Sequence, residues 1–500
     1  MAAFSGSTSV RFDGRLAVIG LAFLCAGMIA IGAMVEQQPL IAAAALVVIP
    51  AALIVLFRPE LAVPVVLFVM YSNAAIVAVR FHGAPPFLAM LVPAPLLIPF
   101  IYNIMVLRQP LIVTPVLPWI LVFVGWQLVC ALLCVDSVKS VSGVLSTVLE
   151  GLLFYVLITN VVRSPGSMRL GVWALMAAGA VMGGVSVCQQ ATRSFDSNFG
   201  GFGQVSEGDG FEVAEGHGVV RQRRLCGPIG EQNRYAQVML MLIPLALARF
   251  LTERANGLRL LALAAAVLTA LGCGLTFSRS GAIAFVLMLL VGLAVRFVSR
   301  RQVTAVFLGG LLLLLAVPQY RTRLATVPSA LGIFGSSVGA EEPDGAILGR
   351  ATEMLAAARM AIDHPLFGVG PEMSGSFTRQ YGQIGGLRAL EGDRETHCLF
   401  LEVAAESGLP GILLFLGMLA ASVLSLLRIR QQVVGRDREL EHTVSGFLLA
   451  LTGYLAMGIF LHMSYIRYFW LMLAMADACY GVALSSAAQA QDRRAEEAVV

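Results

Sequence analysis

The 500-residue sequence has little charge and lacks several motifs that identify soluble enzymes. Only 13% of its residues are charged, well below the roughly 25% that is usual in soluble domains. It contains no GxxxxGK[ST] phosphate loop, no HExxH, no CxxC and no Asp-x-Asp pair. These absences argue against P-loop chemistry and common zinc sites, and they leave no obvious divalent-metal site for a sugar phosphate. We therefore expect no metal and no other cofactor.

Apolar residues, in contrast, make up 58% of the chain. Apolar runs of roughly 17–22 residues recur along its whole length, and a helix of that length crosses the core of a bilayer. This pattern predicts an all-α polytopic membrane protein with about fourteen transmembrane helices and two long extracytoplasmic loops. The net charge of +4 is spread over loops and gives no reason to expect nucleic acid as a partner. No cleavable signal peptide is expected, because the first apolar run lacks a small-residue cleavage site.

The apolar runs divide the chain into six regions. The expected spans lie near Leu16–Met34, Pro39–Phe57, Leu61–Val79, Phe87–Leu107, Pro115–Cys134, Ser140–Val162, Leu170–Gln190, Arg234–Leu251, Leu260–Phe277, Gly281–Val298, Val303–Gln319, Leu399–Leu427, Thr443–Leu461 and Tyr465–Ser485. The corresponding regions are N-terminal transmembrane helices (1–190), a first extracytoplasmic loop (191–233), central transmembrane helices (234–319), a large extracytoplasmic catalytic loop (320–398), C-terminal transmembrane helices (399–485) and a cytoplasmic tail (486–500).

The basic residues of the short loops predict the orientation. With the N-terminus in the cytoplasm, eighteen arginines fall on the cytoplasmic side, against four basic residues outside: Arg80, Lys139, Arg279 and Arg467. This bias agrees with the positive-inside rule. We therefore expect an inner-membrane protein with both termini in the cytoplasm and both long loops outside, where nucleotide sugars are not available.

Arginines dominate the charge of the predicted outer side. Arg279 lies between two apparent spans, and Arg350 follows Gly349 in the second loop. A guanidinium binds phosphate through a planar, two-pronged fork, so these residues suggest an anionic ligand such as a lipid pyrophosphate. The alternative is that they pair with acidic side chains or lipid headgroups, and Arg279 can also snorkel. For Arg221 and Arg223 a solvated surface is the favoured interpretation.

His397 is the best single candidate for proton transfer. It lies where the second loop joins an apolar helix, and imidazole is suited to accept a hydroxyl proton near neutral pH. Glu402 and Glu406 follow at a spacing of four, so they share a helix face and could orient the histidine or line an acceptor site. The alternative is a helix start at the membrane surface whose polar residues simply face water.

Four segments together resemble the bacterial O-antigen ligase and polymerase family of membrane glycosyltransferases. The resemblance covers about two-fifths of the chain, from Arg224 to Met418, and depends on the order of the segments. They are Arg224–Gly227 with Gln232–Ala236, then Leu275–Gly281, then Gly349–Arg350 with His364–Gly370, and finally His397 with Leu401–Glu402 and Glu406–Gly411. The family usually has Asn after the histidine, where this chain has Cys398.

The resemblance implies a GT-C-like fold and an inverting, metal-independent glycosyltransferase. The implied donor is a glycan on undecaprenyl pyrophosphate, and the acceptor is a hydroxyl on another glycan, on lipid A core or on a protein. His397 would act as the base, and Arg279 and Arg350 would stabilise the leaving pyrophosphate. The residues implied in substrate binding are Arg224, Asn233, Glu402 and Glu406.

Two other classes of protein have to be weighed against a glycosyltransferase. A flippase or transporter for a lipid-linked glycan would place ionisable residues deep in several spans, whereas the sequence offers mainly Glu150 and Asp477. A structural protein of envelope assembly would also have many spans and a large outer loop. The set of Arg279, Arg350 and His397 argues against that class.

Overall fold

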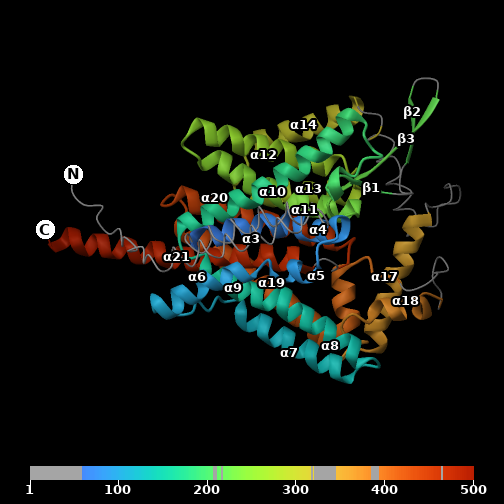
Figure 1. The fold of residues 1–500 in the computed structure, drawn as a ribbon, viewed down its shortest axis with the longest axis horizontal. Helices are drawn as coiled ribbons and strands as arrows, with labels where there is room; N and C mark the ends of the chain where they lie inside the picture. The colour runs from blue at the N-terminus through green and yellow to red at the C-terminus, as the bar shows by residue number, and fades with distance from the viewer. Residues whose placement is uncertain are drawn as a thin grey trace, which may run out of the picture.

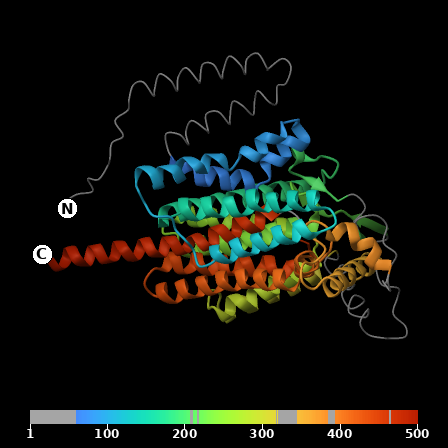
Figure 2. The same ribbon diagram turned by 90° about the horizontal axis from the view of Figure 1, so that it is seen from below.

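The computed structural model describes residues 59–206, 211–215, 218–316, 319, 345–383, 394–462 and 466–499. Long helices run side by side through the molecule, and short helices and strands gather at one end of them (Figure 1). The same layering is visible from below, where the final helix extends beyond its neighbours at the opposite end (Figure 2).

The first half of the described chain is helical up to residue 192. Its α-helices are α3 (Ala62–Tyr71), α4 (Ala74–His82), α5 (Pro86–Leu91), α6 (Leu97–Ile101), α7 (Leu117–Leu133), α8 (Ser137–Ser146), α9 (Leu153–Val161) and α10 (Pro165–Thr192). The short 3₁₀ helices are η1 (Pro59–Leu61), η2 (Ala94–Leu96) and η5 (Phe199–Gly201), and the π-helical turns are η3 (Tyr102–Val106) and η4 (Thr147–Leu152).

The second half contains nine further helices. They are α11 (Gln232–Thr252), α12 (Asn256–Gly274), α13 (Arg279–Ala294), α14 (Arg300–Ala316), α17 (Gly345–Asp363), α18 (Ser374–Gln383), α19 (Leu399–Val433), α20 (Arg438–Gly458) and α21 (Ile466–Val499). We call the end of the bundle that carries α17 and α18 the loop end. The far end is the end at which α11 finishes, near Arg249 and Glu253.

The segment between α10 and α11 adds β-structure to a chain that was expected to be all-α. Its strands are β1 (Gln204–Val205), β2 (Phe211–Glu215), β3 (Gly218–Gln222) and β4 (Leu225–Gly227). β1 pairs with β4 and β2 pairs with β3, both antiparallel. These short pairs lie within the predicted first loop, so the rest of the described fold agrees with the all-α prediction.

Within the described ranges, seven helices are long and apolar enough to cross a membrane, and the bent pair α3–α4 would make an eighth. They are Pro86–Val106, Ser137–Val161, Pro165–Thr192, Gln232–Thr252, Asn256–Gly274, Leu399–Val433 and Arg467–Gln489. The chain is thus a polytopic membrane protein, but the predicted total of about fourteen spans is not confirmed. The apolar helices α7 and α13 are too short to be counted among them. The predicted spans 16–34 and 39–57 lie outside the described residues.

Polar N-cap residues define where several helices begin. Ser164 and Ser167 form a capping box before α10, each side-chain oxygen accepting from the other's backbone N–H at 3.1 Å. The side chains of Asp136 and Ser278 each accept one backbone N–H group, at the starts of α8 and α13. Such caps satisfy backbone N–H groups that have no partner inside the helix.

Helix α11 forms the centre of the bundle and connects its two ends. It packs against α20 and α12, and its side chains are buried on nearly every face. A helix that is buried all round belongs to the interior of a large bundle. Its first residues, Gln232 to Arg234, lie at the loop end, so the core of the protein itself positions part of the candidate site.

Candidate functional site at the loop end

Residues 364–370 of the second loop are docked directly on residues 405–411 of α19. Pro410 has no N–H group, so it cannot satisfy the carbonyl of Glu406 inside α19. Gly370 N–H donates to that carbonyl instead, at 3.1 Å. Leu409 N–H leaves the helix pattern as well and donates to Pro365 O at 2.7 Å. The break in α19 therefore exchanges hydrogen bonds with the loop that follows α17.

Two glycines make this docking possible. Gly368 and Gly408 both have φ of 67°, in a region that favours glycine. A Cβ at Gly368 would lie 2.3 Å from the Glu406 backbone, and a Cβ at Gly408 would lie 2.3 Å from Leu366 O. Since neither position has room for a side chain, the third and fourth sequence segments form a single structural unit.

His397 lies beside this unit, immediately before α19. Its Nδ1 is 2.6 Å from Glu353 Oε2, and Glu353 comes from the middle of α17. The Glu353 side chain is only 2% exposed, whereas that of His397 is 28% exposed. Arg394 Nη1 contacts the other carboxylate oxygen at 3.3 Å. A buried carboxylate thus lies against the Nδ1 side of the imidazole and leaves part of the ring accessible.

A second group of polar side chains faces His397. The ring of His462 stands edge-on to the His397 ring, with centroids 5.7 Å apart. Arg234 is 3% exposed, and its Nη1 donates to the His462 carbonyl at 2.6 Å. Burial, together with the charges of Arg234 and His397, lowers the pKa of His462 from 6.5 to about 2. His462 is therefore a neutral imidazole at physiological pH.

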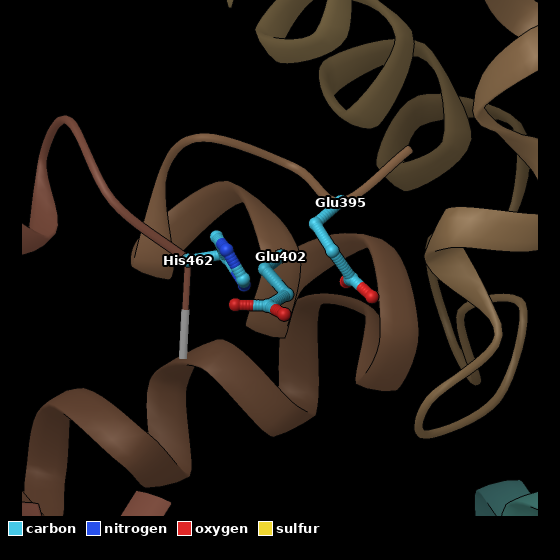
Figure 3. A group of neighbouring side chains, drawn as sticks. All are labelled: Glu395, Glu402 and His462. Carbon is cyan, nitrogen blue, oxygen red and sulfur yellow. The ribbon is translucent and has the colours of Figure 1, made fainter. Parts of the chain in front are cut away.

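Glu395, Glu402 and His462 bring their donor atoms within 4.8 Å of one another (Figure 3). They come from the segment before α19, from its first turn and from the end of the α20 segment. Two carboxylates and a neutral imidazole form a donor set that suits a divalent cation. The guanidinium of Arg234 beside His462 works against a cation there, so the same trio also suits a ligand with hydroxyl groups.

The predicted arginine site at Arg279 rests on a buried polar network. Arg224 is 3% exposed, and it donates from Nε to Thr276 O at 2.8 Å and from Nη2 to Asn233 Oδ1 at 3.1 Å. Ser278 Oγ donates to the same Asn233 oxygen at 2.8 Å. Arg224 and Asn233 therefore hold the turn that presents half-buried Arg279 as the first residue of α13.

The remaining predicted residues occupy different positions at the loop end. Arg350 is half-buried on α17, one turn before Glu353 and on the same face. Glu402 is 9% exposed and belongs to the trio described above. Glu406 Oε1 accepts from Ser374 Oγ at 2.7 Å, so this carboxylate lies at the start of α18.

Cys398 is the N-cap residue of α19 and makes no capping hydrogen bond with its side chain. Burial raises the pKa of its thiol, so the sulfur is neutral near pH 7. Asparagine is among the best N-cap residues because its side chain accepts from the first free N–H groups. The asparagine of the family pattern would thus cap the start of α19. In this chain, with Cys398 there, His397 still contacts Glu353.

Sequence reasoning missed four residues that surround His397. They are Glu353, Arg394, Glu395 and His462. The spacing of Arg350 and Glu353 on one amphipathic helix is a usable signal. His462 has no such signal, because its helix pair meets His397 only through the tertiary fold.

A comparison with known protein families matches part of this chain. A family model described as O-antigen ligase matches residues 264–416. The match includes the Arg279 turn, α17 and the His397 segment, and it ends within α19. The chain therefore contains an O-antigen ligase domain, which confirms the family that its motifs resemble. No curated protein matches the chain.

The O-antigen ligase domain supports a glycan-transfer role at family level. The family implies a ligase or glycosyltransferase type of enzyme, with a lipid-linked glycan and an acceptor as substrates.

Proposed function

We propose that the protein transfers a glycan from an undecaprenyl-pyrophosphate donor to an acceptor hydroxyl at the outer face of the inner membrane. The observation that carries this proposal is the 2.6 Å contact between His397 Nδ1 and the buried Glu353 carboxylate. It lies within the O-antigen ligase domain. The acceptor is a growing polysaccharide, lipid A core or a protein, and polymerase and ligase share the chemistry proposed here.

The contact with Glu353 defines the role of His397. When Nδ1 holds its proton toward the carboxylate, Nε2 is the basic nitrogen of the ring. Nε2 then takes the proton from the acceptor hydroxyl while its oxygen attacks the anomeric carbon. Glu353 stabilises the imidazolium that forms, as a carboxylate does behind other catalytic histidines. Glu353 is a positioning residue, since it acts through the histidine.

The leaving group requires positive charge on the opposite side of the reacting carbon. As the bond from the anomeric carbon to the pyrophosphate oxygen breaks, negative charge grows on the phosphates. Arg279 and Arg350 would stabilise this charge through fixed, charge-assisted hydrogen bonds. The new bond forms from the face opposite to the leaving group, so the anomeric configuration inverts. Arg224 and Asn233 support the step by holding the turn before Arg279.

The transporter alternative finds little support in the described spans. Asp477 is 1% exposed, and it accepts from Tyr155 Oη at 2.9 Å and from Ser422 Oγ at 2.7 Å. An acid satisfied in this way ties helices together and is not poised along a pathway. Glu150 is exposed on the surface of the bundle.

The test is turnover of a defined lipid-linked oligosaccharide donor by purified protein in nanodiscs, with a synthetic acceptor. His397→Ala should lower transfer by roughly 10²–10⁴-fold, the usual contribution of a positioned acid–base group. Donor binding should persist, because the proposal assigns the pyrophosphate to arginines. Cys398→Asn is the neighbouring control and should be tolerated. Transfer by His397→Ala within a few-fold of wild type would remove the histidine from the mechanism.

A further inference from the structure

A cavity separate from the His397 centre opens between α4 and the segment that follows α10. Its volume is about 660 Å³, within the range of ligand-binding sites. We call this cavity the arginine groove. It is lined by Arg80 and Phe81 at the end of α4, by residues 195–198, by residues 203–206, and by Arg221 and Arg223 at the end of β3.

The charge of the arginine groove is mainly positive. Arg80, Arg221 and Arg223 line it, and Asp196 is the acidic residue among its lining residues. Arg223 Nη1 contacts Asp196 Oδ1 at 3.1 Å. Arg221 is opposite Glu212 in the β2–β3 ladder. The guanidinium of Arg80 lies over the Phe81 ring, 5.8 Å from its centroid. Planar guanidiniums of this kind recognise carboxylates through paired hydrogen bonds.

Aromatic and amide side chains complete the lining. Phe81, Phe195 and Gln204 are half-buried there, and Asn198 is exposed. A Cβ at Gly201 would lie 2.4 Å from the Phe81 ring, so glycine lets the ring pack flat against the backbone. Aromatic faces that pack the C–H side of a sugar ring, with amides for its hydroxyls, are suited to a saccharide. A phosphate alone would not need the rings.

The arginine groove is joined to the candidate site by a short chain of contacts. Arg80 Nη1 and Gln204 Oε1 both lie beside Gly230, which has φ of 85°. The next residue, Glu231, accepts from the backbone N–H of Asn233 at 2.9 Å. Asn233 in turn accepts from Ser278 before Arg279. A chain held in the groove thus lies next to the elements that present Arg279.

We propose that the arginine groove binds an anionic saccharide segment, one bearing uronate or similar carboxylate groups, of the glycan that the enzyme handles. The identity of the ligand as a glycan rests on the proposed transfer function. The carboxylates would pair with Arg80 and Arg223, the sugar faces would pack on Phe81 and Phe195, and the groove would select the charge of the transferred or receiving chain.

The experiment measures equilibrium binding to the purified full-length protein, without donor, by calorimetry. The probes are tetragalacturonate, neutral maltotetraose and inorganic pyrophosphate, each at low and at high salt. Tetragalacturonate should bind best, and high salt should weaken it because exposed charges are screened. Arg80→Gln and Arg223→Gln should each weaken binding by about 5–10-fold, as expected for a lost charge-assisted hydrogen bond at a partly exposed site.

Two further variants sharpen the test. Asp196→Asn removes the competing carboxylate and should strengthen tetragalacturonate binding. Arg193→Gln changes an exposed arginine outside the lining and should leave binding unchanged. Equal binding of maltotetraose, preference for pyrophosphate, or indifference to Arg80→Gln and Arg223→Gln would each overturn the proposal. His397→Ala should bind the probe normally, so failure of the groove and failure of the transfer chemistry can be told apart.

Discussion

Two buried glutamates at opposite ends of the bundle, Glu253 and Glu353, show how similar burial leads to different roles. Both side chains are 2% exposed. Glu253 at the far end contacts Arg169 and Arg249, and Trp173 Nε1 donates to it at 3.1 Å. Arg249 is itself 2% exposed. Arg169 is 41% exposed, but every partner around Glu253 is a permanent donor, so this centre is an ionic link.

The centre around Glu353 is built differently. Its partners are Arg394, which is 42% exposed, and His397, which is 28% exposed and can gain or lose a proton. A buried carboxylate facing a titratable and accessible partner can respond to a substrate. The comparison teaches that burial alone does not distinguish a structural acid from one that serves a reaction. The chemical nature of the partner does, since Arg169 and Arg394 are about equally exposed.

The predicted orientation places the two centres on opposite faces of the membrane. A reporter that is active only in the cytoplasm should be active when fused after Arg436, near the far end. The same reporter inserted near Gly385, in the second loop, should be silent. The measurement is reporter activity normalised to protein level. Reversed signals would place the His397 centre in the cytoplasm and exclude an outer-face reaction.

Arginine-to-lysine changes should lower transfer at the loop end and stability at the far end. Arg350→Lys and Arg279→Lys keep the charge and lose the two-pronged fork, so transfer should fall by roughly 10²-fold. Their thermal unfolding should stay normal. Arg249→Lys should instead lower stability by about 1–3 kcal/mol through its buried contacts, with transfer per folded molecule unchanged. If both loop-end variants transferred glycan at the wild-type rate, Arg279 and Arg350 would have no role in the reaction.

Neutral isosteres of the two glutamates give the closest matched pair. Glu353→Gln should lower transfer by roughly 10–100-fold, because the imidazole loses its anchor and the charge behind it. Glu253→Gln should lower the melting temperature and leave transfer per folded molecule unchanged. Transfer by Glu353→Gln equal to that of wild type would make Glu353 purely structural.

The docking of residues 364–370 on residues 405–411 can be tested at a single glycine. Gly408→Ala forces a side chain into the Leu366 carbonyl and into a backbone conformation suited to glycine, and should cost about 3 kcal/mol or more. Gly435→Ala is the control, since its φ is 73° but nothing lies within 4 Å of the added Cβ. It should cost about 1 kcal/mol. Thermal unfolding checks both, and equal shifts would mean that the docking is not rigid.

The smallest effect is expected from metal removal. The sequence predicts a metal-independent reaction, and Arg234 opposes a cation in the trio of Glu395, Glu402 and His462. Excess EDTA should therefore change transfer by less than about twofold, measured against a buffer-matched control. If activity disappeared and returned with a divalent ion, the trio would become a metal site and the proposed reaction would need revision.

Local chemistry made much of this protein predictable from its sequence. Within the described chain the predicted spans fall mainly on helices, because apolar length is a property of contiguous residues, although the predicted span 61–79 is broken between α3 and α4. Ser164, Ser278 and Asp136 begin helices through bonds to residues only two or three positions away. The order of the four segments, with His397 and Arg279 among them, was enough to indicate the O-antigen ligase family that the 264–416 match confirms.

Only the tertiary structure decided which side chains meet. Glu353 reaches His397 across 44 positions of sequence, and His462 arrives from a different helix pair altogether. Arg224 and Asn233, expected at a substrate, are engaged in holding a turn, and Glu406 is engaged at α18. Periodicity and spacing specify faces of single helices, whereas such contacts depend on how those faces pack. The break at Pro410 and the glycines opposite it fix that packing at the loop end.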